Sequence, residues 1–89
     1  MDARRDTRPG IEAMVEQMAC AGCTDVAVLG GGEHDWMACT SPRGNRLTLS
    51  WDETRGALTL VRFLARRDAS TIVGRFRMLN AAADTAATI

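Results

Sequence analysis

The chain has no lysine, no tyrosine and a single histidine among its 89 residues. No apolar run approaches the roughly 20 residues of a membrane-spanning helix, so the sequence predicts no membrane span. Residues 1–10 are polar and lack the apolar core of a signal peptide, and we therefore expect a cytoplasmic protein with reduced thiols. With one histidine, only one side chain titrates near neutral pH, and no catalytic constellation or cofactor site can be assembled around it.

The composition is that of an ordinary globular chain. It is 46% hydrophobic and 25% charged, with a net charge of zero. We predict one domain over residues 1–89, with frayed ends at 1–8 and 84–89. A domain of this size buries only about 60% of its unfolded surface, so a bound partner or a homodimer would stabilise it.

Two segments have apolar residues at helical spacing. The first predicts a helix over residues 10–21, ended by Gly22. Its apolar face carries Ile11, Met14, Val15 and Met18. The second predicts a helix over residues 69–83, because apolar residues recur there at intervals of 4, 3 and 4. These residues are Ile72, Phe76, Leu79 and Ala83.

Between these segments, short alternating runs predict strands over 25–29, 34–40, 46–51 and 57–65. In the third strand Leu47, Leu49 and Trp51 should point inward. In the fourth, the inward phase shifts toward Val61 and Phe63, which indicates a bulge or a strand covered on both faces. We predict an α+β fold: an N-terminal helix, a four-stranded antiparallel meander and a C-terminal helix, with both helices on one face of the sheet.

Residues 18–23 have the form M-x-C-x-x-C. The motif resembles that of heavy-metal-associated domains, which carry copper on two thiolates, and implies a metal carrier that uses Cys20 and Cys23. In that family the motif lies between a strand and a following helix, whereas here it ends a helix and precedes a strand. Buried cysteines at a helix end are the alternative, and we expect no metal site at this pair.

His34 follows a run of glycines and begins a predicted strand. This Gly-x-His start, with the later turn at 42–44, resembles HicA-type mRNA interferase toxins. The resemblance implies RNA cleavage by His34, with Gly32 and the turn as the other matching positions. The strand around His34 is acidic, however, whereas an RNA-cleaving domain is expected to be basic. A polar surface histidine is the alternative interpretation.

Charge is unevenly distributed along the chain. Residues 54–78 hold six arginines against one acid, whereas residues 1–53 hold nine acids against five arginines. Such asymmetry favours a charged partner, although solvated arginines would give the same pattern. We therefore predict a partner-binding surface that combines an arginine cluster with one tryptophan among polar neighbours. Its residues are Arg62, Arg66, Arg67, Arg75, Arg77 and Trp36.

The sequence thus favours a small non-enzymatic protein that binds a macromolecule. The expected partner is another protein, and nucleic acid remains an alternative through the arginine cluster. The exclusive use of arginine indicates a GC-rich bacterial or phage genome, where an inhibitor or adaptor of the anti-defence kind would fit. An RNA-cleaving toxin that uses His34 and a metal carrier that uses Cys20 and Cys23 are the alternatives.

If the arginine cluster contacts the partner, the double variant Arg66→Glu with Arg67→Glu should bind more weakly without unfolding. Exposed charged contacts are screened, so wild-type binding should also fall as salt rises. Binding at low and high salt, with circular dichroism as the folding control, checks both effects. Equal binding of the double variant at low salt would reduce the cluster to a solvated face.

Overall fold

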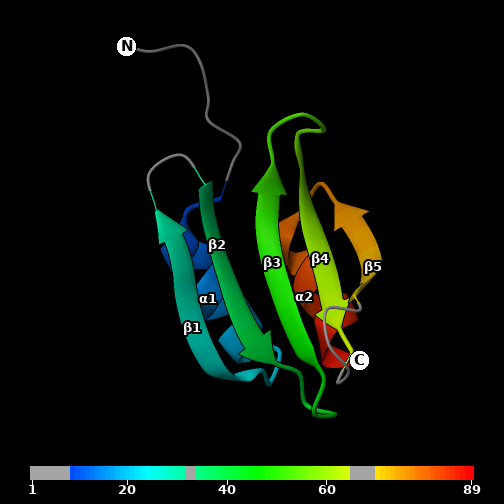
Figure 1. The fold of residues 1–89 in the computed structure, drawn as a ribbon. Helices are drawn as coiled ribbons and strands as arrows, with labels where there is room; N and C mark the ends of the chain where they lie inside the picture. The colour runs from blue at the N-terminus through cyan, green and yellow to red at the C-terminus, as the bar shows by residue number, and fades with distance from the viewer. Residues whose placement is uncertain (1–8, 32–33, 65–69) are drawn as a thin grey trace.

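The computed structural model describes residues 9–31, 34–64 and 70–89, and this part of the chain forms two helices and five strands (Figure 1). In chain order the elements are α1 (Ile11–Cys20), β1 (Thr24–Gly31), β2 (His34–Thr40), β3 (Arg46–Asp52), β4 (Ala57–Phe63), β5 (Ser70–Phe76) and α2 (Leu79–Ala87). The predicted α+β class is confirmed, with five strands instead of four.

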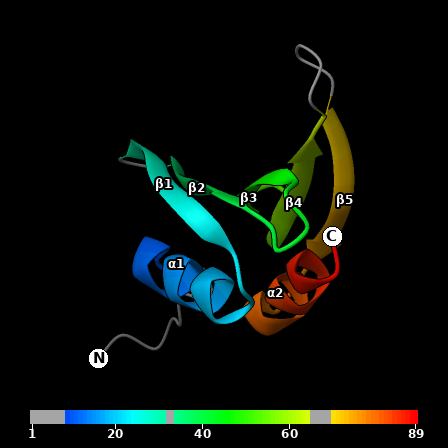
Figure 2. The same ribbon diagram turned by 90° about the horizontal axis from the view of Figure 1, so that it is seen from below.

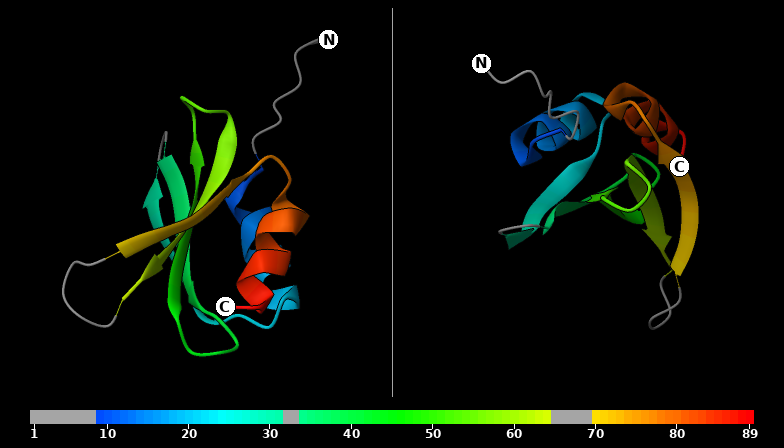
Figure 3. Two further views of the ribbon diagram at one scale, coloured as in Figure 1. Left: turned by 90° about the vertical axis from the view of Figure 1, so that its right-hand side faces the viewer. Right: turned by 90° about the horizontal axis from the view of Figure 1, so that it is seen from above.

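The strands form one antiparallel meander in the order β1-β2-β3-β4-β5. Both helices lie on the same face of this sheet, as predicted (Figure 2). α1 lies against β1 and β2, whereas α2 lies against β4 and β5, and the other face carries neither helix (Figure 3). Neither helix of the described residues is long and apolar enough to cross a membrane.

α1 ends in a Schellman motif, as the glycine after it predicts. Gly22 has a φ of +94° and donates its N–H to the carbonyl of Ala19, while Cys23 donates to the carbonyl of Met18. Met18 and Cys23 are both buried, so the motif joins the end of the helix to the core. The turn also packs on Pro42, because a Cβ at position 22 would lie 3.2 Å from its Cγ.

The core lies between the sheet and the two helices. Its largest fully buried side chains are Met14, Met18, Met37, Leu47, Leu49, Leu58, Leu60 and Cys39. Cross-strand pairing puts Met37, Leu49 and Leu60 in one row on the helix-covered face. α2 contributes only small buried side chains, Ala82, Ala83 and Ala86, so this helix can approach the sheet closely.

The predicted helix over 69–83 is right only for residues 79–83, which belong to α2, and is wrong for residues 70–76. Residues 70–76 form β5, and α2 begins only at Leu79. The segment contains the β-branched run Thr71–Val73 followed by Gly74, and both features disfavour a helix. Pairing with β4 then decides in favour of a strand.

A bulge in β5 explains the misleading helical spacing. Leu60 pairs with Gly74 and Val61 pairs with Ile72, so Val73 is the extra residue, on β5. Val73 and Phe76 both pack against the core although they are three residues apart. The sequence predicts a bulge or two covered faces in the fourth strand. The side chains of β4 instead alternate regularly between the two faces, and Val61 and Phe63 lie on the face without helices.

The end of the carboxyl-terminal helix packs on the core, and the predicted fraying of 84–89 stays a prediction. α2 continues to Ala87, and Ala86 is fully buried. Asn45 Nδ2, in the turn between β2 and β3, donates to the Ile89 carbonyl over 2.7 Å. Residues 1–8, also predicted to fray, lie outside the described residues.

Gly74 is required because the ring of Phe76 occupies the space above it. A Cβ at position 74 would lie 2.8 Å from the ring Cζ. We expect Gly74→Ala to destabilise the fold by about 1 kcal/mol, since the ring must shift within a packed core. Urea unfolding measures the change, and a Phe76→Leu background provides the control. If Gly74→Ala costs as much in that background, the ring is not the cause.

Candidate functional site

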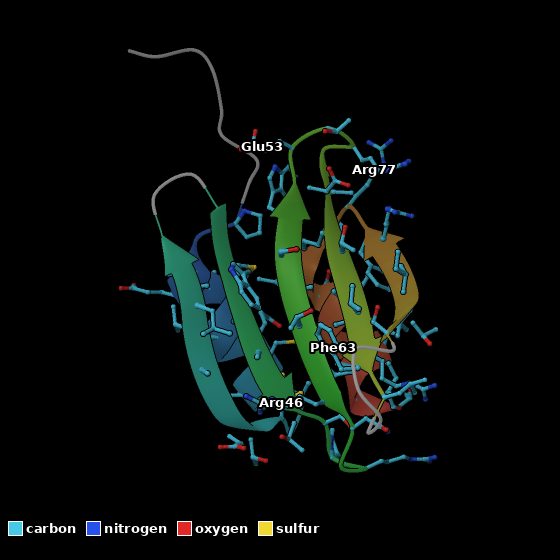
Figure 4. All side chains as sticks on the ribbon, in the orientation of Figure 1. Arg46, Glu53, Phe63 and Arg77 are labelled. Atoms are coloured by element: carbon cyan, nitrogen blue, oxygen red, sulfur yellow. The ribbon has the colours of Figure 1, made fainter. Side chains whose placement is uncertain are left out.

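One face of the sheet is left without helices, and we call it the open face (Figures 1 and 4). Cross-strand register defines its rows. One row runs Leu29, Trp36, Ser50, Thr59 and Arg75; the next runs Ala27, Ala38, Thr48, Val61 and Ile72; a third runs Thr40, Arg46, Phe63 and Ser70. The centre of this face is therefore small and uncharged, with larger side chains around it.

The larger apolar side chains of the open face are exposed. Leu29 is 37% exposed, Phe63 39% and Ile72 53%. Trp36, predicted as an exposed anchor, is half-buried between Leu29 and Ser50 in its row.

Arg46 ties the edge strand to the middle of the sheet. Its Nη1 donates to the Asp25 carbonyl over 2.7 Å and to Thr40 Oγ1 over 3.0 Å, and it lies 3.5 Å from an Asp25 carboxylate oxygen. Asp25 has a φ of +53°, in a bulge of β1 that an aspartate tolerates. Arg46 pairs with Phe63 across the strands, so one corner of the open face combines a held guanidinium with an aromatic ring (Figure 4).

The predicted arginine cluster is not a single surface in the described residues. Arg75 lies on the open face, in the same row as Trp36 but three strands away, or roughly 14 Å at the usual strand spacing. Arg77 is exposed beyond the end of β5. Arg62 pairs with Leu47 and so lies on the helix-covered face. Arg66 and Arg67 lie outside the described residues.

Arg62 is half-buried, and its Nε finds no hydrogen-bond partner in the described part of the chain. A buried donor without a partner costs free energy of folding, so the position of Arg62 in β4 fixes this side chain more than any interaction of its charge does. Because Arg62 and Arg75 lie on opposite faces of the sheet, they cannot bind one phosphate or carboxylate together. Of the predicted binding residues that the structure describes, Arg75 and Trp36 lie on the open face.

The three cysteines are divided between surface and core. Cys20 is exposed at the end of α1, whereas Cys23 and Cys39 are buried. Burial, together with the neighbouring Cys23 thiol, raises the pKa of the Cys39 thiol from 9.0 to about 12, against a smaller opposing effect of Arg46. Cys23 therefore lies beside Cys39 in the core, whereas Cys20, the other cysteine of the metal-carrier motif, is exposed.

His34 begins β2 and pairs with Gly31 across the hairpin. Its side chain lies outside what the structure describes, as do Gly32, Glu33 and the side chain of Asp35. In the described part of the chain, no three His, Cys, Asp or Glu side chains gather into a metal-binding group.

Sequence reasoning predicts a sheet face without helices, but not the rows of side chains on it. Those rows depend on β5, which lies in the segment predicted as a helix, and on the register that aligns Phe63 with Arg46 and Ile72 with Val61. The β-branched run in residues 71–73 was the signal that could have revealed the fifth strand.

No family model, curated protein or solved structure matches the chain. The function must therefore be inferred from the chemistry of the surfaces described above.

Thiol labelling tests the division of the cysteines. In the native protein, iodoacetamide near pH 8 should modify Cys20 alone, because Cys39 is buried and keeps its proton at that pH. The folded state holds this proton more tightly than the unfolded state, so its stabilising effect is complete below about pH 9 and is lost as pH rises toward 12. Mass spectrometry after proteolysis identifies the labelled peptide.

Cys20→Ser should abolish native labelling, and denaturant should expose both remaining thiols. Labelling of Cys39 in the folded protein would contradict the assignment.

Proposed function

We propose that this protein is a non-enzymatic module that binds a protein partner on its open face. The observation that carries the proposal is the chemistry of that face: an uncharged centre of Ala, Ser, Thr and Val side chains with exposed apolar groups around it. Depletion of charge at the centre, with aromatic residues and arginine nearby, is typical of protein interfaces.

The exposed apolar groups surround this centre on several strands. Leu29 belongs to β1, Phe63 to β4 and Ile72 to β5, so a partner that contacts all three must cover most of the sheet. A broad, flat contact of this kind suits a folded protein better than a small molecule, which needs a concave site.

Arginine placement also favours a protein over nucleic acid. Among the open-face arginines that the structure describes, Arg46 is held by Asp25 and Thr40, which leaves Arg75 to meet a partner's charge. Nucleic-acid binding requires several cations along the backbone path. A small domain that covers a partner's surface without changing it chemically can serve as an inhibitor or adaptor, and the proposal includes that role.

The double variant Phe63→Glu with Ile72→Glu tests the proposal. Both side chains are exposed, so the fold should survive, while two carboxylates on an apolar contact should weaken binding by at least about tenfold. Full-length protein is immobilised, incubated with lysate of the source organism, and the retained molecules are identified by mass spectrometry and nucleic-acid staining.

Three outcomes are informative. One protein captured by the wild type and by His34→Ala, but lost with the double variant, supports the proposal. Capture of RNA that disappears with His34→Ala favours the toxin alternative instead. Equal capture of the same protein by wild type and double variant would show that the open face is not the interface.

A further inference from the structure

A second surface lies on the helix side of the sheet, at the free edge of β1. A groove of about 510 Å³ runs there between α1 and β1, and it is lined by Ile11, Glu12, Val15, Glu16 and Val28. Val28 faces the helix side, because it pairs with the core residue Met37. It is nevertheless 57% exposed, so α1 does not cover it.

The edge beside this groove is open to a further strand. β1 is first in the strand order and pairs with β2 alone among the described strands. A bulge at Asp25 interrupts the start of β1, but the segment 26–29 reads Val-Ala-Val-Leu and contains neither proline nor charge, two other devices that commonly protect an edge. Val26 is exposed there as well. An added strand would find both backbone groups to pair with and an apolar groove for its side chains.

The charged side chains around the groove determine which kind of added strand would bind there. Glu12 and Glu16 line the groove, and neither α1 nor β1 contains a basic residue. If a second copy paired edge to edge about a two-fold axis, the two α1 helices would face each other and bring their glutamates together. A strand that carries arginine or lysine beside its apolar residues would instead meet opposite charge.

We propose that the β1 edge and its groove bind an extended segment of a partner protein, in which apolar side chains alternate along the strand and cationic residues flank them. The segment adds a sixth strand to the sheet. Its apolar side chains enter the groove over Val28, and its cations reach Glu12 and Glu16. This surface is separate from the open face and is tested independently of it.

The probe is the peptide Arg-Thr-Val-Thr-Val-Thr-Arg, labelled with a fluorophore. In a strand its valines and arginines fall on one side and its threonines on the other. Fluorescence anisotropy with the full-length protein should show binding that weakens as salt rises. Two control peptides accompany it: one with glutamate for both arginines, and one with proline for the central threonine, which removes a backbone donor. Each should bind at least about tenfold more weakly.

Protein variants locate the site. Val28→Arg should abolish peptide binding, whereas the matched variant Ile72→Arg should keep it. Both are exposed β-branched residues on edge strands, 57% and 53% exposed, but only Val28 lines the groove. The double variant Glu12→Arg with Glu16→Arg should reverse the preference and bind the glutamate peptide better. Hydrogen exchange should show new protection of those β1 amides that do not already bond to β2, because alternate N–H groups of an edge strand point away from its partner.

Several results would overturn the proposal. These are equal binding of the arginine and glutamate peptides, wild-type binding by Val28→Arg, or no protection of β1. A wild-type dimer in sedimentation that Val28→Arg dissociates would assign the edge to a second copy instead. Loss of lysate capture on the open-face variant, with peptide binding intact, would separate this site from the proposed function.

Discussion

The structure depends on one constraint: two short helices must cover the apolar face of a five-stranded sheet. α1 has 10 residues and α2 has 9, or about 15 Å of helix each at 1.5 Å per residue. Side by side they cover one face of the sheet and none of the other. The alternation of side chains along each strand therefore separates a buried face of methionine and leucine from an exposed face of threonine, serine and scattered apolar groups.

The same constraint limits the covered face at its margins. α1 leaves Val28 uncovered, so a groove remains at the β1 edge. At the opposite edge of the sheet, α2 packs closely on the strands through its buried alanines, and the ring of Phe76 covers Gly74. Apolar surface therefore stays exposed beside α1 and on the face that carries no helix. The two surfaces proposed for binding are consequences of how little chain is available to cover the sheet.

Charge follows the meander across the molecule. Because each strand lies beside the next, the order of residues in the chain becomes their order across the sheet. The acidic residues of α1 and β1 gather at one edge, and Arg75 and Arg77 at the other. The bridge from Arg46 to Asp25 joins the two halves over β2. The uneven charge along the chain thus becomes an uneven distribution of charge over the surface, which can orient a charged partner.

Local periodicity and turn chemistry predict the first helix with its glycine stop and β2 to β4 with their turns, and the one-sided burial of an antiparallel meander predicts both helices on one face. Long-range strand pairing decides the structure of the last third of the chain. Residues 70–76 have a helical spacing that a bulge produces, and pairing with β4 makes them a strand. Strand register likewise put Arg62 and Arg75 on opposite faces and Cys23 beside Cys39. Such contacts join residues far apart in the chain, and no local pattern records them.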